Sequence, residues 1–446
     1  MAIQIGGLAT GLDTNELITQ LLKIERKPIE RLQREQSYLK SRLDAFTKFD
    51  SKLKGLLEKA EGLASFDKIA ANKAVAASED YFSVSASSSA EQGDYNINVV
   101  SLARREKEVS QGFADISAGE FGTGTLSLTV GGESVDITLD ETNNSLGGIR
   151  DAINAAGAGV SASIINDGDP DNPYRLVLTA DDAGTAVEAT ASLTGGTYAS
   201  PLFTQTQEGS QAHIKVDGID IYRNSNSITE AIPGVTIDLL KPHADAAETT
   251  GVQVDLDVDA VEKKVKDFVT SYNEVVSFIS DQSDSSWGRD SGLHMPLRRL
   301  QSMIGSALGG DNSIQALTQL GVSTQKDGTL KVDGAVLKGA ISDDLDGVVG
   351  LFAGSAATEG LSAKLVDYLK SVTDRSDGIL ASRKTATDSG LRRLDSQIER
   401  QEARLEQREE TLRAQFTAME QLVSSMNATS SYLSQLPNLT HLAGGQ

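Results

Sequence analysis

Apolar residues recur at alternating steps of three and four near both ends of the 446-residue sequence, and no other feature limits the possible fold as strongly. One stripe occupies residues 29–64 and the other residues 391–433. Such heptad spacing gives a helix one apolar edge, which needs a partner helix to cover it. We therefore expect a long coiled-coil helix at each end of the chain.

The expected helices can be given lengths and ends. At ~1.5 Å rise per residue, a helix over 28–63 would be roughly 50 Å long and one over 388–436 roughly 70 Å. Asp13 is a suitable N-cap for a preceding helix, with Glu16 three residues later. Pro28 is expected to interrupt this helix and to begin the next, where its missing N–H is harmless.

The charges of the two arms are complementary. Residues 23–59 contain 11 basic and 6 acidic side chains, a net charge of +5, whereas residues 388–436 contain 6 and 8, a net charge of −2. The whole chain carries −22, so its acidity lies in the central body. The simplest interpretation is that the two termini pair with each other and close the chain into a hairpin.

Polar residues interrupt both stripes, at Gln36, Asp50, Gln401 and Arg408. Each buried apolar residue contributes ~1.5–3 kcal/mol of transfer free energy, and each ordered residue costs ~1–2 kcal/mol of backbone entropy. An isolated pair of arms should therefore be marginally stable. Two interpretations remain open: an ordinary intramolecular coiled coil, or arms whose tips gain order only on docking. The second is favoured because the stripe continues past any pairing partner, through Leu433 and Leu436.

The central body combines strand and helix patterns. Residues 94–259 alternate apolar and polar positions, with a strong hairpin signal at Asp217-Gly218 and one short helix at 146–153. From Val261 onward the apolar residues return to helical spacing, apart from one small β unit. The predicted fold class is α+β and multidomain, with a terminal helical coiled-coil leg, a mostly helical domain and two nested β-rich domains.

Composition excludes several classes of protein. The excess of 63 Asp and Glu over 41 Lys and Arg argues against nucleic-acid binding, which needs a basic surface. The absence of cysteine excludes disulfides and thiolate sites, and it fits a protein that is exported unfolded. No stretch reaches the ~18 apolar residues of a membrane span, and no cleavable secretory signal is visible. We therefore expect no membrane insertion.

Residues that could carry chemistry are scattered. The sequence lacks a P-loop, a nucleophile elbow and a dinucleotide fingerprint. The turn at Asp167 resembles a calcium loop, but Asn172 stands where glycine is required and Leu178 where a bidentate Glu is required. Three alternating aspartates at 255–259 predict an exposed strand face or, as the sharper alternative, a carboxylate ladder for a cation. The histidines lack metal-site spacing and are interpreted as surface or loop residues: His213, His243, His294 and His441. We expect no enzyme, no cofactor and no metal.

Five stretches distributed over the whole sequence carry a family resemblance. They are "GGLATGLDTNELITQLLKIERKPIERLQ", "YNINVVSLARREK", "HIKVDGIDIYRNSNSITEAIPGVTIDLL", "DGTLKVDGAVL" and "RLEQREETLRAQFTAMEQLVSSMNATSSYLSQL". In combination they resemble the bacterial flagellar filament-capping proteins, also called hook-associated protein two or the FliD family. The third stretch is quite specific, whereas a heptad stripe alone would not be.

The resemblance implies a division into four domains. The helical leg docks toward the filament, a mostly helical domain follows, and two β domains form an outer plate. The expected bounds are 1–64 with 385–446 for the leg, 65–91 with 259–384 for the helical domain, 92–115 with 206–258 for one β domain, and 116–205 for the outer β domain.

The resemblance also implies a structural role without chemical catalysis. Several copies would form a ring-like cap at the distal tip of the flagellar filament and hold exported flagellin while it folds and inserts. The implied partners are further copies of this chain, flagellin, hook–filament junction proteins and a cytosolic export chaperone. Export would follow the flagellar type III route, without a cleaved signal peptide, to an extracellular location.

The predicted assembly interface is the apolar edge of the leg. It comprises Leu17, Leu21, Leu32, Leu39, Leu43, Phe46, Leu53, Leu394, Ile398, Leu405, Leu412, Phe416, Met419, Met426 and Leu433. Two alternative functions remain. One is a surface adhesin whose acidic outer β domains bind host mucin or glycan, and the other is a hook–filament junction protein, which also has helical termini.

Overall fold

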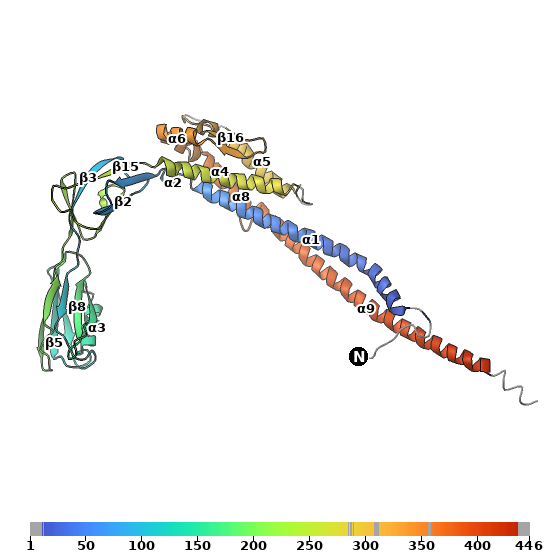
Figure 1. Ribbon diagram of the computed structural model, residues 1–446, viewed down its shortest axis with the longest axis horizontal. Helices are drawn as coiled ribbons and strands as arrows, with labels where there is room; N and C mark the ends of the chain where they lie inside the picture. Colours follow the sequence, from blue (N-terminus) through green and yellow to red (C-terminus); the bar gives the residue numbers. More distant parts are fainter. Residues whose placement is uncertain are drawn as a thin grey trace, which may run out of the picture. The chain divides into compact units, whose positions relative to one another are not determined.

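The computed structural model describes residues 11, 13–283, 285, 288, 290–306, 312–355 and 358–435. The chain divides into two compact units, whose elements are labelled in Figure 1. Unit 1 comprises Met1–Ala64, Lys264–Ala340 and Asp346–Gln446, and unit 2 comprises Ser65–Lys263 and Ile341–Leu345. Helices dominate unit 1 and strands dominate unit 2, so the predicted α+β multidomain class is confirmed.

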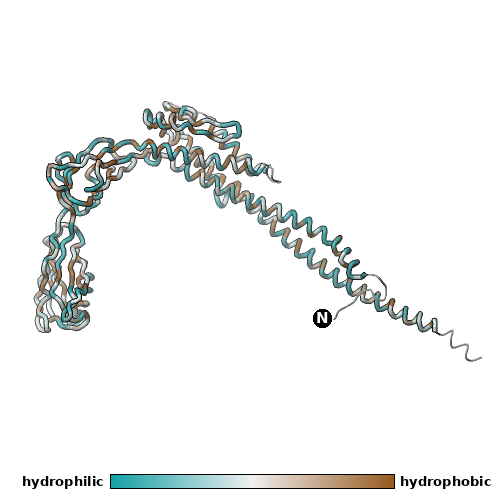
Figure 2. The backbone as a smooth tube through the Cα atoms, viewed as in Figure 1, coloured by the Kyte–Doolittle hydropathy of each residue, from teal (hydrophilic) through white to brown (hydrophobic). Residues whose placement is uncertain are grey.

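Two long antiparallel helices form the leg of unit 1, α1 (Thr14–Glu61) and α9 (Ile379–Gln435). At ~1.5 Å per residue, their 48 and 57 residues extend over about 72 Å and about 86 Å. Asp13 caps α1 as predicted, because its carboxylate accepts the N–H of Glu16 at 3.0 Å. Figure 2 shows hydrophobic positions recurring between hydrophilic ones along both helices. The predicted pairing of the two terminal arms is confirmed (Figure 1).

Helix α1 runs through Pro28, so the predicted interruption there is wrong. Proline lacks the N–H that would bond to the carbonyl four residues earlier, but its fixed φ is helical. The loss of one hydrogen bond is tolerated because the apolar edge stays covered at this level, where Ile29 is only 2% exposed. Figure 1 shows α1 bending near its N-terminal end, and a proline within a helix is a common cause of such a bend.

Shorter helices and a small hairpin complete unit 1. The predicted apolar face of α4 (Val258–Asp281) is confirmed, with Phe268 and Tyr272 buried. The side-chain amide of Asn273 donates to the carbonyl of Leu330 at 2.8 Å and accepts its N–H at 2.7 Å, which attaches the hairpin to α4. The other elements are α5 (Ser291–Gly305), η1 (Leu317–Leu320), β16 (Val322–Thr324), β17 (Leu330–Val332), α6 (Gly334–Asp343), α7 (Leu345–Phe352) and α8 (Leu361–Thr373).

The first part of unit 2 holds a five-stranded and a three-stranded sheet around one apolar core. The hairpin predicted at Asp217-Gly218 is confirmed, because both residues have positive φ, 49° and 83°, as a type I′ turn requires. The larger sheet has the order β1 (Asn72–Ala76), β15 (Thr250–Leu256), β3 (Gly93–Ser101), β11 (Ala212–Val216) and β12 (Ile219–Arg223). The smaller sheet has the order β13 (Ser227–Ile232), β14 (Val235–Leu239) and β2 (Phe82–Ala86).

Residues 65–91 were expected in the mostly helical domain, and for most of this segment that expectation is wrong. It contains one short helix, α2 (Phe66–Ile69), followed by β1 and β2. β1 pairs with β15, and β2 pairs with β14, so both strands belong to the β-rich unit. Both are short and rich in Ala and Ser, and their partners come much later in the chain, which leaves little local signal.

The second part of unit 2 has its own core between two sheets and one helix. Strands β4 and β10 belong to it, so it reaches beyond the predicted range 116–205. Its elements are β10 (Phe203–Gln207), β4 (Lys107–Ser110), β8 (Tyr174–Ala180) and β7 (Val160–Asn166) in one sheet, β6 (Glu133–Leu139), β5 (Thr123–Val130) and β9 (Val187–Thr194) in the other, and α3 (Leu146–Ala156). The remaining bounds of the four-domain division stay predictions.

The two aspartate-rich stretches form a turn, at 167–172, and a helix cap, at Asp257. Asp169 accepts the N–H groups of Asn172 and Asp171, each at 2.9 Å, and these hydrogen bonds hold its pKa below the ordinary value. β15 ends at Leu256, and Asp257 caps α4 by accepting the N–H of Ala260 at 2.9 Å. The predicted strand of alternating aspartates is therefore wrong. Within the described ranges, no group of three or more His, Cys, Asp or Glu residues is arranged to hold a metal.

The histidines were expected at the surface or in loops, but His213 lies in β11 and His294 in α5, both half-buried, and one histidine is a buried loop residue. His243 lies in a loop but is 8% exposed, stacked on Tyr81 with ring centroids 3.8 Å apart. Its Nδ1 accepts the N–H of Val99 at 2.9 Å, and its Nε2 lies 3.1 Å from Oγ1 of Thr250. The imidazole therefore completes the hydrogen bonding of a buried strand. His441 lies outside the described residues.

Candidate functional site

Three polar contacts across the leg fix the register of α1 against α9. Arg408 Nε lies 3.3 Å from Glu25 Oε1, and Gln36 Nε2 donates to Asp395 Oδ1. Near the other end of the leg, the third contact joins Lys384 to Asp50 at 2.8 Å. Partners advance along α1 as they retreat along α9, as an antiparallel pair requires. Three of the four polar residues predicted to interrupt the stripes thus bond across it.

Burial along the predicted interface differs between the inner end of the leg and the distal end, where α1 begins. The buried members are Phe46, Leu53, Leu394, Ile398 and Leu412, of which Phe46 and Leu53 are fully buried. The half-buried members are Leu32, Leu39, Leu43, Leu405, Phe416 and Met419. The exposed members are Leu17, Leu21, Met426 and Leu433. The structure therefore unites most of the predicted residues in one seam and leaves four of them uncovered.

The prediction omitted several buried residues of the same seam. Ile29 and Leu391 lie on the heptad stripes, Ile18 precedes the first stripe by eleven residues on the same helix face, and all three are at most 7% exposed. Phe49 and Leu56 are fully buried because α1 packs on other helices of unit 1 as well as on α9. The ring of Phe49 stacks on that of Phe278 of α4 with centroids 6.0 Å apart. A second apolar row beside the heptad stripe was the available signal for these residues.

Ionic contacts reinforce the buried end of the seam. The side chain of Asp50 is 13% exposed and lies between Lys54 at 2.9 Å and Lys384 at 2.8 Å. Arg42 pairs with Asp290 at 2.6 Å, and the same carboxylate caps α5 by accepting the N–H of Gly292 at 2.8 Å. Both carboxylates are therefore largely removed from water and paired; Asp50 joins the two leg helices, and Asp290 ties the leg to α5.

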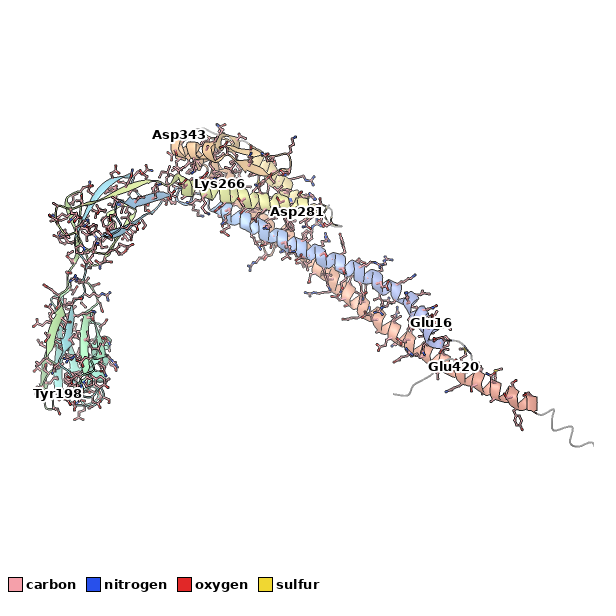
Figure 3. All side chains as sticks on the ribbon, viewed as in Figure 1. Glu16, Tyr198, Lys266, Asp281, Asp343 and Glu420 are labelled. Atoms are coloured by element: carbon pink, nitrogen blue, oxygen red, sulfur yellow. The ribbon has the colours of Figure 1, made fainter. Side chains whose placement is uncertain are left out.

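The distal end of α9 continues past the start of α1. Figure 3 places Glu16 of α1 and Glu420 of α9 at the same level of the leg. Beyond this level α9 extends for about four further turns. Its large apolar side chains there are exposed: Leu422 at 61%, Met426 at 62%, Tyr432 at 69% and Leu433 at 59%. The predicted continuation of the stripe past its partner is confirmed as far as Leu433, whereas Leu436 lies outside the described residues.

Two profiles of one protein family match most of the chain. They are "Flagellar hook-associated protein 2 N-terminus", at residues 10–106, and "Flagellar hook-associated protein 2 C-terminus", at residues 209–428. A third profile, "Flagellin hook IN motif", matches residues 125–182. The B-type flagellar hook-associated protein 2 of Pseudomonas aeruginosa is 32% identical over 460 residues, which cover 95% of each chain. The chain belongs to the flagellar hook-associated protein 2 family.

Further members of the hook-associated protein 2 family agree with this result. The family member of Escherichia coli strain K12 is 28% identical over 460 residues, covering 96% of this chain and 97% of its own. The crystal structure of the D1-D2-D3 domains of the flagellar cap protein FliD from Escherichia coli is 27% identical, with a TM-score of 0.63. It covers 78% of this chain and 99% of the crystallised one.

Membership of the hook-associated protein 2 family decides between the broad functional classes. The family consists of structural flagellar cap proteins and not of enzymes, so the protein has a flagellar cap role at the tip of the flagellum. The adhesin alternative receives no support from these relatives, whose names refer to the flagellum alone. Among the described residues, no helix is both long and apolar enough to cross a membrane.

Proposed function

We propose that this cap protein assembles into a ring-like homo-oligomer at the filament tip and promotes the folding and insertion of exported flagellin. The single observation that carries the proposal is the uncovered distal end of the leg. An exposed row containing Leu422, Met426 and Leu433 on a helix that is otherwise paired is a surface suited to another helix. The predicted interface is therefore proposed to have two roles, internal pairing near Phe46 and docking beyond Met419.

The leg supports docking because its two ends differ in stability. The inner end is anchored by the fully buried side chains of Phe46, Phe49 and Leu53, whereas beyond Met419 the large apolar side chains Leu422, Met426 and Leu433 are exposed. Local stability follows the number of buried apolar contacts, so the distal end should open or rearrange first. A leg with a rigid base and an adaptable tip can bind a changing filament end without unfolding.

The proposed partners follow from this assembly. Flagellin and further copies of this chain would contact the leg and the β-rich unit, and hook–filament junction proteins would be the first surface that the leg meets. The uncovered apolar row of α9 would need protection before export, which is a role for a cytosolic chaperone that binds the C-terminal region. The absence of cysteine suits passage of an unfolded chain through the flagellar type III route without a cleaved signal peptide.

A deletion strain tests the proposed function. Cells that lack the gene should secrete flagellin monomers and carry hooks without filaments, and a plasmid copy should restore the filaments. Gold-labelled protein should be found at the distal tip of the filament by electron microscopy. Normal filaments in the deletion strain would refute the folding role, and label at the filament base would favour a junction protein.

A further inference from the structure

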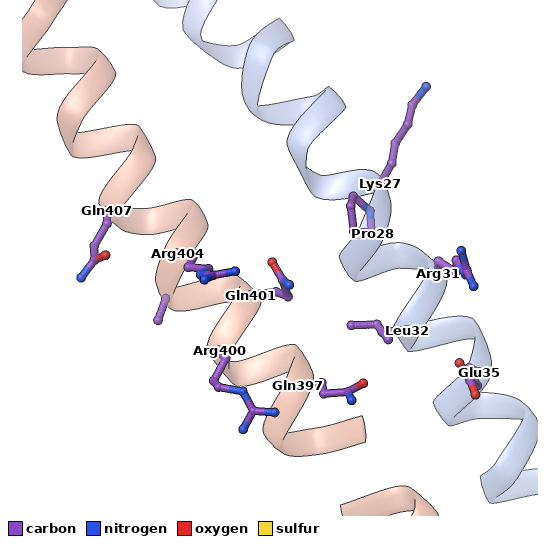
Figure 4. Close-up of a pocket in the computed structure, with 11 residues that line it drawn as sticks. Lys27, Pro28, Arg31, Leu32, Glu35, Gln397, Arg400, Gln401, Arg404 and Gln407 are labelled. Carbon is purple, nitrogen blue, oxygen red and sulfur yellow. The ribbon is translucent and has the colours of Figure 1, made fainter. Parts of the chain in front are cut away.

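A groove with a basic lining lies between α1 and α9, away from the exposed tip (Figure 4). Its volume is about 860 Å³. Its lining consists of Lys27, Pro28, Arg31, Leu32 and Glu35 from α1 and of Gln397, Arg400, Gln401, Ala403, Arg404 and Gln407 from α9. Leu32 and Gln401 point between the helices in Figure 4. Because Gln401 takes a seam position that an apolar side chain would fill, the two helices leave space there.

The charges of the groove are unbalanced. Lys27, Arg31, Arg400 and Arg404 face only one carboxylate of the lining, that of Glu35. All four cations are exposed, and none of their side chains forms an ion pair or a hydrogen bond with another residue in the described ranges. Such a concentration of positive charge is unusual on a chain whose net charge is −22. A surface that brings carboxylates into the groove would relieve this repulsion.

A complementary row lies on another face of α9. Glu399, Glu402, Glu406 and Glu410 follow one another at steps of three, four and four, which places them along one helix face. All four are exposed, and none is paired within the described part of the chain. At roughly 100° per residue, this acidic row and the basic lining of α9 lie roughly 130° apart, on opposite sides of the seam. The leg therefore has one basic flank and one acidic flank.

We propose that the basic groove receives the acidic row of α9 from a second copy of this chain. The contact joins two different surfaces, so each copy can use its groove for one neighbour and its acidic row for another. Such head-to-tail contacts close into rings when the rotation between copies permits. The groove lies between two helices, and a third helix laid in it would complete a three-helix arrangement over the half-buried side chain of Leu32.

This inference rests on the proposed self-assembly and adds the surface that neighbouring legs share. Charge complementarity selects this occupant, because both halves of the contact are present on one chain. The contact is exposed to water, so it gives specificity and register more than strength, and salt should weaken it.

Charge-reversal variants of the full chain test the contact. The groove variant is Arg400→Glu with Arg404→Glu, and the flank variant is Glu402→Arg with Glu406→Arg. Sedimentation equilibrium should show each variant alone self-associating about tenfold more weakly than the unaltered chain, since two attractions become repulsions. An equimolar mixture of the two should regain association, because each altered surface then meets its opposite charge. A control with Lys23→Glu and Arg34→Glu, both exposed and outside the groove, should associate normally.

Directed cross-linking gives a second readout. The chain has no cysteine, so Gln407→Cys in one copy and Glu406→Cys in another provide single attachment points in the groove and on the acidic row. A short bifunctional maleimide should join the two kinds of copy to each other. If the groove variant still self-associates and no such cross-links form, the proposed contact is overturned, but the proposed ring-like assembly is not. A chain that stays monomeric at every concentration overturns both the contact and the proposed self-assembly.

Discussion

We predict that the buried apolar seam, and not the polar contacts across it, provides most of the stability of the leg. Phe46 is fully buried, so Phe46→Ala should reduce the free energy of unfolding of the leg by about 3–5 kcal/mol, through lost transfer free energy and the cavity left behind. The pair of Arg408 and Glu25 has side chains that are 49% and 42% exposed. Removing it by Arg408→Ala should cost about 0.2–1 kcal/mol.

Hydrogen exchange of α1 amides measures both effects locally. This readout is preferable to one unfolding midpoint, because a chain of several units does not unfold in one two-state step. Phe46→Ala should accelerate exchange in α1 by roughly two to four orders of magnitude, at about 1.4 kcal/mol per factor of ten. Arg408→Ala should accelerate it by less than about fivefold.

A matched apolar control and a clear contrary outcome complete this experiment. Leu422→Ala removes a large side chain that is 61% exposed, so it should leave exchange in α1 within about twofold of the unaltered chain. Equal acceleration by Phe46→Ala and Arg408→Ala would refute the reasoning, since the leg would then be held by its surface ion pairs.

Three further predictions concern docking and the β-rich unit. Leu412→Asp with Met419→Asp should abolish attachment to filament tips while the circular dichroism of the β unit persists; continued attachment would exclude the seam as anchor. Burial and, to a smaller extent, repulsion from Glu106 and Glu188 raise the pKa of Glu108, so the free energy of unfolding should rise as the pH falls through that pKa. Glu108→Gln should therefore stabilise the protein at pH 7 by less than ~1 kcal/mol, which would be seen as a higher unfolding temperature, and it should flatten the pH dependence of that temperature. His243→Leu should cost about 1–3 kcal/mol, measured by urea unfolding, because it leaves the N–H of Val99 buried without an acceptor.

The features that sequence analysis predicted correctly are the periodic and local ones. The heptad stripes gave both leg helices, and Asp217-Gly218 gave a hairpin, because the physical cause of each lies within a few neighbouring residues. The wrong expectations share a different cause. β1 and β2 are strands because β15 and β14 pair with them, and Pro28 stays helical because the seam covers its neighbours.

Sequence analysis predicted which residues of the leg lie on the seam, but not which other helices and side chains they meet. One stripe locates Leu394 and Ile398, because each faces the opposite arm. Nothing in a single stripe indicates that Phe49 meets a second helix, or that Arg31 and Arg400 come to line one groove. Such juxtapositions depend on the register of α1 against α9, which polar contacts such as that of Glu25 with Arg408 set.

The two helices of the leg come from opposite ends of the chain, and Glu25 and Arg408, which contact each other across it, are 383 positions apart in the sequence. Everything in between must be synthesised before the stem can close. The entropy lost on joining the two ends grows only with the logarithm of the intervening length, and a body that has already folded shortens the effective loop. Closure of the leg therefore has to wait for the C-terminal helix, and a chain truncated before α9 would leave α1 without its partner helix.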